Sequence, residues 1–253
     1  MKEKLYTIPL NDAVNAHDEC PFCFIERKVE QDLMDFVLGS GSSYMEADIR
    51  EMTDKAGFCR DHFKKMFDYG NTLGNAWILK THYRKMIKEM QEQFASFHPG
   101  RASLKDKFRK SAQSDNPIGI WITQKEEACY ICSQYKDTYQ RYLDTFFYMY
   151  KRDEEFREKL SNCKGFCLPH FKDLCEAADV QLSAKEKEAF YGFMLPLMEN
   201  NMKRIAEDVA WLVEKFDYRN KDADWKNSKD AIQRAMQKLK GGYPADPPYK
   251  TAK

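Results

Sequence analysis

Residues 20–23 read Cys-Pro-Phe-Cys, and residues 57–62 read Gly-Phe-Cys-Arg-Asp-His. The same residue types return in the same order in the second half of the chain, as Cys-Tyr-Ile-Cys at 129–132 and Gly-Phe-Cys-Leu-Pro-His at 165–170. The distance from the Cys-x-x-Cys pair to the third cysteine is almost the same both times. Self-similarity of this kind indicates an internal repeat. The sequence therefore predicts two related halves, each with three cysteines and one histidine.

Three cysteine thiolates and one histidine imidazole form a tetrahedral set that zinc favours, and a two-residue gap lets two cysteines bind one ion. We therefore predict two zinc ions per chain, one in each half. The expected ligands of the first ion are Cys20, Cys23, Cys59 and His62. Those of the second are Cys129, Cys132, Cys167 and His170. Each ligand pair lies at a predicted helix start, where the positive end of the helix dipole favours a thiolate.

Other uses of these cysteines remain open. A disulfide framework is typical of secreted chains, and a thioredoxin-type Cys-x-x-Cys needs a strand–helix–strand context that the sequence does not show. An iron–sulfur cluster is the alternative cofactor, because the same soft ligands bind iron. Cys163 lies four residues before Cys167 and is a candidate alternative ligand or redox partner. His82, in the long helix expected after the first motif, is a second accessory candidate.

The apolar residues recur at spacings of three and four, which is typical of helices. The expected helices and helical stretches cover about residues 22–37, 63–67, 73–94, 129–150, 183–216 and 231–239. Alternating strand patterns are not recognisable. The fold class predicted is all-α, with two related helical halves, each built around a Cys3His site.

This reading divides the chain into four parts. Residues 1–98 form the first helical repeat with its metal site, 99–124 a linker or loop, and 125–218 the second repeat with its metal site. Residues 219–253 form a C-terminal arm, a helix and a tail rich in proline. The polar run Asp217–Trp225 has no assigned function; we expect it to be an ordered structural arm, with part of a ligand site as the alternative. The two connections within the repeats, 44–55 and 151–159, are expected to be polar and irregular.

The composition excludes several classes of partner. Of 253 residues, 41 are Lys or Arg and 40 are Asp or Glu, so the net charge of +1 gives no general attraction to nucleic acid or to an anionic membrane. Apolar runs stay far below the roughly 18 residues of a membrane span. The charged stretch Met1–Thr7 has no apolar core of a signal peptide. We expect a cytoplasmic protein whose partner is another protein or a small molecule.

The chain resembles a family of bacterial proteins of unknown function, found mostly in anaerobic Gram-positive lineages, that carries a doubled Cys-Pro-x-Cys and Gly-Phe-Cys-x-x-His pattern. The resemblance extends over Ser43–Glu46, Asn71–Gly74 and Lys215–Trp225, and spans about Tyr6 to Leu239. Tyr130 stands where the first half has proline, a position that does not ligate metal. The resemblance supports the fold and implies no activity.

Four protein ligands leave a metal no open position for water or substrate. The favoured function is therefore a zinc-stabilised helical binding or scaffold protein without enzymatic activity. One alternative is a thiol-based redox or metal-responsive protein that uses the Cys-x-x-Cys thiols and Cys163. Another is an enzyme with a pocket between the halves, although the sequence has no phosphate-binding glycine loop, nucleophile elbow or His-Glu-x-x-His motif.

Overall fold

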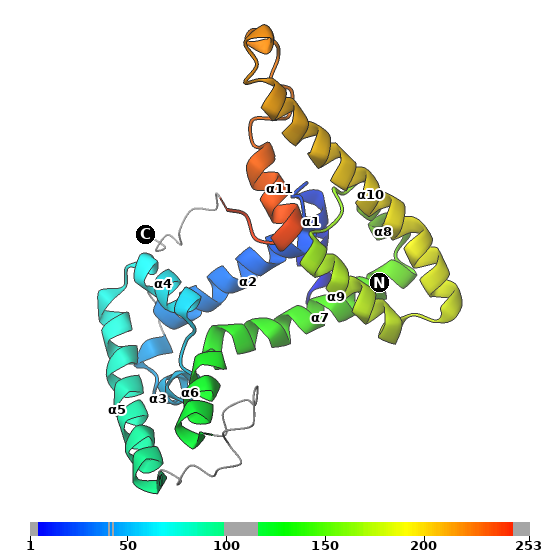
Figure 1. Ribbon diagram of the computed structural model, residues 1–253. Helices are drawn as coiled ribbons and strands as arrows, with labels where there is room; N and C mark the ends of the chain where they lie inside the picture. Colours follow the sequence, from blue (N-terminus) through cyan, green and yellow to red (C-terminus); the bar gives the residue numbers. More distant parts are fainter. Residues whose placement is uncertain (1–4, 40, 42, 99–115, 245–253) are drawn as a thin grey trace, which may run out of the picture. The chain divides into compact units, whose positions relative to one another are not determined.

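A computed structural model describes residues 5–39, 41, 43–98 and 116–244, and it is built of helices throughout these ranges (Figure 1). No strand occurs in the described residues, so the all-α prediction is confirmed. The helices are α1 (Thr7–Asn15), α2 (Pro21–Leu38), α3 (Ala47–Ala56), α4 (Arg60–Tyr69), α5 (Thr72–Ser96), α6 (Pro117–Glu127), α7 (Tyr130–Arg152), α8 (Glu154–Ser161), α9 (Leu168–Gln181), α10 (Ala184–Glu214) and α11 (Ala231–Lys240). Two short 3₁₀ turns, η1 (Ser43–Met45) and η3 (Tyr218–Asn220), complete the described elements. None of these helices is long and apolar enough to cross a membrane.

The chain forms two compact units that do not follow the predicted ranges 1–98 and 125–218. Unit 1 combines residues up to Glu30 with those from Lys136 onward, and Unit 2 contains Gln31–Tyr135. Helix α2 begins in Unit 1 and ends in Unit 2, whereas α7 begins in Unit 2 and ends in Unit 1. Each unit therefore joins the start of one repeat to the end of the other. The repeat in the sequence is not a repeat of separate domains.

Three helices replace segments expected to be irregular. Helix α3 occupies most of the polar connection 44–55, α8 lies in 151–159, and α6 lies partly in the predicted linker 99–124, whose residues 99–115 are outside the described range. The sequence of these helices shows no clear apolar periodicity, because they bury few side chains. Helix α6 buries no residue, α3 buries only Thr53, and α8 buries only Phe156 and Leu160. A local N-cap stabilises α8, because the side chain of Asp153 accepts a hydrogen bond from the backbone N–H of Phe156 at the start of this helix.

The core of Unit 1 is aromatic. The ring of Phe22 lies 5.8 Å from Phe146 and 5.8 Å from Phe166, so α2, α7 and the segment before α9 meet at one point. One face of α7 is buried, and it includes Tyr139, Tyr142, Leu143, Phe146 and Phe147. Unit 2 has its own core, which contains Met34, Val37, Leu38, Met66 and Ile78.

The run Asp217–Trp225 folds back on the C-terminal end of α10, where helix side chains donate hydrogen bonds to its carbonyl oxygens. The ammonium of Lys215 donates to the carbonyl oxygens of Asn220, Lys221 and Ala223 at 2.6, 3.0 and 2.6 Å. The indole N–H of Trp211 donates to the carbonyl of Asp224 at 2.9 Å. The run is thus held to the helix by buried and half-buried donors, which gives it a structural role. The N-cap residue of helix α10 is Ser183, which forms a capping box with Glu186, and the helix continues through Pro196.

Helix α11 is fastened to the segment before α2 by buried charges. The ammonium of Lys238, 1% exposed, donates to the carbonyls of Glu19 and Lys164 and lies 3.4 Å from the Glu19 carboxylate. The side chain of Arg234 pairs with Asp208 on α10 at 2.8 Å. Because Glu19 is only 3% exposed, its charge depends on these cations. The network holds α11 against the residues that lead into the first Cys-x-x-Cys.

Replacement of Lys238 by Met should therefore destabilise Unit 1. The substitution keeps the volume but leaves two buried carbonyls without a donor and weakens the pairing of Glu19, at a cost of about 3 kcal/mol. Chemical denaturation measures the change. The matched control is Lys240→Met, two residues further on the same helix and exposed, which should change stability by less than about 0.5 kcal/mol. Equal effects of the two substitutions would contradict the fastening role.

Candidate metal centres

The eight predicted ligands come together in two groups, but each group draws on both repeats. Site A consists of Cys20, Cys23, Cys167 and His170. Site B consists of Cys59, His62, Cys129 and Cys132. The expectation that each half of the sequence supplies all four ligands of its own site is wrong. Each Cys-x-x-Cys pair joins the Gly-Phe-Cys-x-x-His segment of the other half.

The path of the chain explains the exchange. The first Cys-x-x-Cys lies at the start of α2 in Unit 1, but α2 runs on into Unit 2 and delivers the first Gly-Phe-Cys segment there. Helix α7 makes the opposite passage with the second pair of motifs. A helix of 18 residues extends about 27 Å and separates the first Cys-x-x-Cys from the residues that follow α2, which stay in Unit 2 up to Tyr135.

The local structure at each site follows from the motif. Cys59 is the N-cap residue of α4 and Cys167 that of α9, with each histidine three residues later on the first turn. Gly57 and Gly165, two residues before these cysteines, have φ of 65° and 71°. Such backbone conformations favour glycine, which explains its place in the motif. The thiols therefore meet the positive ends of helices, as predicted.

In Site A one imidazole nitrogen faces all three sulfurs. His170 Nδ1 lies 3.4, 3.5 and 3.2 Å from the Sγ atoms of Cys20, Cys23 and Cys167. The sulfurs of Cys23 and Cys167 are 3.7 Å apart. A tetrahedron with zinc–sulfur bonds of about 2.3 Å and a zinc–nitrogen bond of about 2.0 Å has edges of about 3.8 Å between sulfurs and about 3.5 Å from sulfur to nitrogen. The donor set of Site A fits one such ion.

Site B repeats this arrangement. His62 Nδ1 lies 3.1, 3.3 and 3.4 Å from the Sγ atoms of Cys59, Cys129 and Cys132. The sulfurs of Cys59 and Cys132 are 3.9 Å apart. The backbone N–H of Tyr130 donates to the carbonyl of Gly57 at 2.9 Å, which joins the two ligand-bearing segments next to the site. The cysteines of both sites are free thiols with no disulfide.

The two sites differ in burial. All four ligands of Site A are buried, whereas in Site B Cys59 is half-buried and Cys132 is exposed. Burial lowers the pKa of His170 to about 4 and raises the pKa of Cys20. Desolvation also opposes ionisation of Cys129, but contacts with His62 and with backbone N–H groups outweigh it and lower that pKa to about 6. A neutral imidazole is the form that binds metal, and a cation at the centre offsets the repulsion among three thiolates.

The C-terminal end of α11 covers Site A. A Cβ atom placed on Gly241 would lie 3.6 Å from the sulfur of Cys167 and 3.9 Å from that of Cys23. Gly241 has φ of 78° and ends α11. The buried network of Lys238 and Glu19 therefore holds a lid of backbone over Site A. The sequence predicts this helix but not its position over Site A, because a lysine in an amphipathic helix gives no sign of burial.

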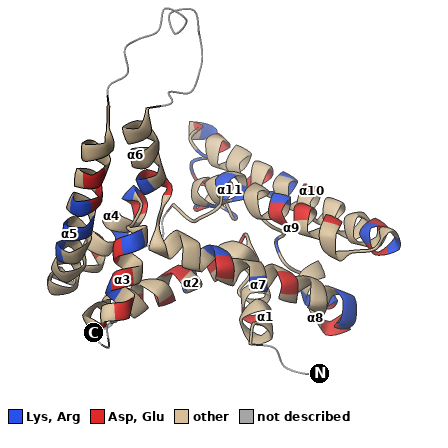
Figure 2. Cartoon of the chain, turned by 90° about the horizontal axis from the view of Figure 1, so that it is seen from below, with Lys and Arg blue, Asp and Glu red and all other residues tan. Residues whose placement is uncertain are grey.

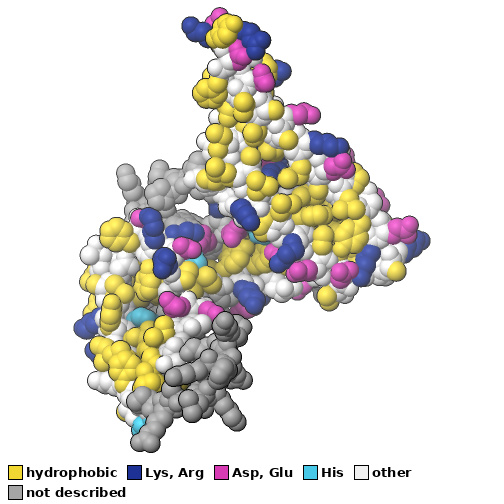
Figure 3. Space-filling model, viewed as in Figure 1, with side chains coloured by type: hydrophobic (Ala, Val, Ile, Leu, Met, Phe, Trp, Pro, Cys, Tyr) yellow, Lys and Arg dark blue, Asp and Glu magenta, His cyan; other side chains and the backbone are white. Residues whose placement is uncertain are grey.

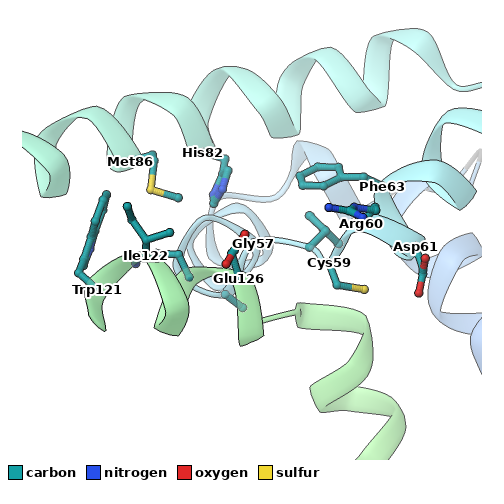
Figure 4. A pocket seen from close by; sticks show the side chains of 13 residues that line it. Gly57, Cys59, Arg60, Asp61, Phe63, His82, Met86, Trp121, Ile122 and Glu126 are labelled. Carbon is teal, nitrogen blue, oxygen red and sulfur yellow. The ribbon is translucent and has the colours of Figure 1, made fainter. Parts of the chain in front are cut away.

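A pocket of about 680 Å³ opens beside Site B, within Unit 2 (Figure 4). Its wall includes the segment that carries the ligand Cys59, and helices α5 and α6 supply the rest. His82, an accessory candidate from the sequence, lines this pocket and is not among the ligands of Site B. Its Nδ1 lies 3.1 Å from the carbonyl oxygen of Asp54. Apart from Cys59 and His82, none of the lining residues was a predicted site residue.

The second accessory candidate, Cys163, is buried outside Site A. Its sulfur accepts from the N–H of Gly165 at 3.3 Å, and burial raises the pKa of its thiol. Among the described residues, the group at Site A contains four ligands without it. Cys163 thus supports the turn that leads into Cys167.

Replacement of Gly57 by Ala should loosen Site B. Gly57 has φ of 65° and ψ of −160°, a region open almost only to glycine, and a Cβ would lie 3.0 Å from Cε1 of His82. We expect a loss of about 1–3 kcal/mol and faster transfer of one zinc ion to a chromogenic chelator. In the control Gly192→Ala, a Cβ within α10 meets nothing within 4 Å, and both ions should be retained. Identical zinc release from the two variants would refute this role of Gly57.

Comparisons with known proteins add a family and no activity. No curated protein and no solved structure matches the chain. A family model matches nearly its whole length, in agreement with the resemblance seen in the motifs. The chain belongs to a family of unknown function (DUF6062), whose model matches residues 1–246.

Proposed function

We propose that the protein is a zinc-stabilised helical binding protein without enzymatic activity, in which one zinc ion stabilises each of the two units from within. The observation that carries the proposal is the closed donor set: in each site, three sulfurs and one imidazole nitrogen lie within 4.8 Å of one another and face a common centre. A zinc ion with four protein ligands has no position left for substrate or water, which is the usual arrangement of a structural site.

The spacing of the sulfurs also supports zinc over an iron–sulfur cluster. Sulfurs 3.7 and 3.9 Å apart leave room for one ion, and several irons with their bridging sulfides would push the thiolates further apart. Zinc is the commonest single ion for Cys3His sets in structural sites. The proposal therefore includes two zinc ions per chain. A cytoplasmic location is part of it, because a reducing compartment keeps eight cysteines available as thiols and thiolates.

The surface supports binding of a protein or a small molecule more than binding of nucleic acid. Acidic and basic side chains are interspersed along the helices (Figure 2), and their totals nearly cancel. Apolar side chains are exposed among them on the face seen in Figure 3. At the end of α10, the exposed fractions of Val213, Phe216 and Tyr218 are 66%, 83% and 85%. Exposed apolar groups of this size are typical of contact surfaces.

A second function, a thiol-based redox response, is favoured by one observation: Cys132 of Site B is exposed. Peroxide could oxidise the thiolates of Cys129 and Cys132 to a disulfide. Each peroxide molecule takes two electrons from the two sulfurs and, with two protons, becomes two molecules of water, while the zinc ion is released. Site A is buried and is expected to resist this reaction.

Single substitutions test the structural role of zinc. Cys167→Ser and Cys59→Ser should each remove one zinc ion and lower the melting temperature by about 10 °C or more, since a lost site costs several kcal/mol. Zinc content by elemental analysis and thermal unfolding are measured on the same samples. The control is Cys175→Ser, a half-buried cysteine outside both sites, which should keep two ions. Loss of zinc with unchanged melting would contradict a structural role.

Graded oxidation separates the two functions. If the sites are only structural, peroxide at a few equivalents should leave both zinc ions bound. A redox response predicts rapid release of one ion and formation of one disulfide, reversed by a thiol reductant. Mass spectrometry after alkylation would place the disulfide between Cys129 and Cys132. If the ion of the buried Site A were released first, the expectation that the exposed Site B reacts first would be wrong.

A further inference from the structure

We infer that the pocket beside Site B binds a small zwitterion with an apolar or aromatic side chain, such as an apolar amino acid. This inference rests on the proposed binding function and names the chemistry of its ligand. The pocket lies wholly within Unit 2, and its volume of about 680 Å³ falls within the usual range for small-molecule sites.

One end of the pocket is apolar. Met86 of α5 and Trp121 and Ile122 of α6 gather there, as Figure 4 shows. Ile122 has an exposed fraction of 46%, so α6 offers this side chain to the pocket without burying it in a core. An indole, a thioether and a branched aliphatic chain form a surface suited to an aromatic or aliphatic group. This end accounts for the apolar part of the ligand.

The remainder of the lining carries charges of both signs. Arg60 and Lys125 are cationic and Asp61 and Glu126 are anionic, so the lining is formally neutral. Lys125 is paired with Glu89. Arg60, Asp61 and Glu126 form no ion pair with any described residue, including one another. A lining of this kind disfavours a ligand with net charge and suits one that brings its own ammonium and carboxylate.

The positions of these groups set the orientation. Figure 4 shows the carboxylate of Glu126 near the middle of the pocket, below His82, with Arg60 on the side away from Trp121. The ligand ammonium is therefore assigned to Glu126 and its carboxylate to Arg60. A guanidinium can hold a carboxylate through two parallel hydrogen bonds. The side chain of the ligand then points to the apolar end.

His82 adds an acceptor. A carbonyl oxygen only accepts, so the hydrogen bond between His82 Nδ1 and the carbonyl of Asp54 puts the proton on Nδ1. In the neutral ring Nε2 is then an acceptor, and it has no hydrogen-bond partner among the described residues. The imidazole edge lies over Gly57, where a side chain would block it. An ammonium N–H of the ligand is a suitable donor for Nε2.

The pocket is coupled to Site B through one segment. Residues 57–61 form part of the pocket wall, and they contain the ligand Cys59 and lead directly to His62. Metal at Site B fixes the position of this segment, so binding of the zwitterion should weaken when that ion is removed. Site A is in the other unit and should have no such effect.

Isothermal titration calorimetry of the full zinc-loaded chain tests the inference, with L-phenylalanine as the probe. We expect saturable binding of one molecule per chain. N-acetyl-L-phenylalanine, which lacks the ammonium, and L-phenylalanine amide, which lacks the carboxylate, should each bind at least about ten-fold more weakly, because one charge-assisted hydrogen bond is lost.

Three pairs of variants locate the binding site. Glu126→Gln, Arg60→Gln and Ile122→Ser should each weaken binding of L-phenylalanine about ten-fold or more. Their controls are Glu127→Gln, Arg84→Gln and Ile120→Ser, which alter exposed residues on the same or a neighbouring helix outside the pocket lining. Ile120 and Ile122 are matched closely, with exposed fractions of 47% and 46%. Glu126→Gln should also abolish the preference for phenylalanine over its N-acetyl derivative.

Absence of saturable binding, or equal effects of a variant and its control, would overturn the inference. Equal affinity for phenylalanine and its two derivatives would show that the pocket recognises neither the ammonium nor the carboxylate, which would overturn the inference of a zwitterionic ligand. Zinc content and melting temperature are recorded on the same samples. If the unsubstituted protein contains two zinc ions but does not bind phenylalanine, the result refutes the ligand and leaves the proposed function intact. If the purified protein contains no zinc, the result refutes the proposed function itself.

Discussion

Coordination across the repeats is the constraint on which the rest of the structure depends. In Site A, Cys20 and His170 are 150 residues apart, and in Site B Cys132 and His62 are 70 apart. Neither group of ligands is complete until distant parts of the chain have met, so a metal ion bound at either site would tie together segments that are far apart in the sequence. Such non-local contacts carry a large loop-closure entropy, which metal–thiolate bonds offset. Helices α2 and α7 underlie this exchange of ligands, because each carries the chain from one unit into the other.

The same ligand set is used in two different surroundings. Site A lies in an aromatic core, with α11 fastened over it by Lys238 and Arg234. Site B has an exposed cysteine and shares its ligand-bearing segment with a pocket. The burial of Site A suits a permanent structural ion, whereas Site B is the site at which we propose that metal and ligand binding influence each other. The internal repeat therefore yields one closed site and one that faces the solvent.

Much of this arrangement could be predicted from residue types and spacing. All eight ligands, the all-α class, the aromatic face of α7 and the cap Ser183 follow from local patterns. The pairing of the ligands could not be predicted, because either pairing satisfies the same motif and only the path of α2 and α7 decides between them. Helices α3, α6 and α8 bury too few side chains to leave an apolar pattern. The burial of Lys238 depends on carbonyls of residues 19 and 164, which are distant in sequence.

Zinc content of two double variants tests the crossed coordination most directly. Cys23 and Cys167 belong to one site in this account, whereas Cys23 and Cys59 belong to different sites. Elemental analysis should therefore find about one zinc ion per chain in Cys23→Ser with Cys167→Ser, and almost none in Cys23→Ser with Cys59→Ser. Coordination within each half of the sequence predicts the opposite result: no zinc in the first double variant and one ion in the second. That opposite result would contradict the account.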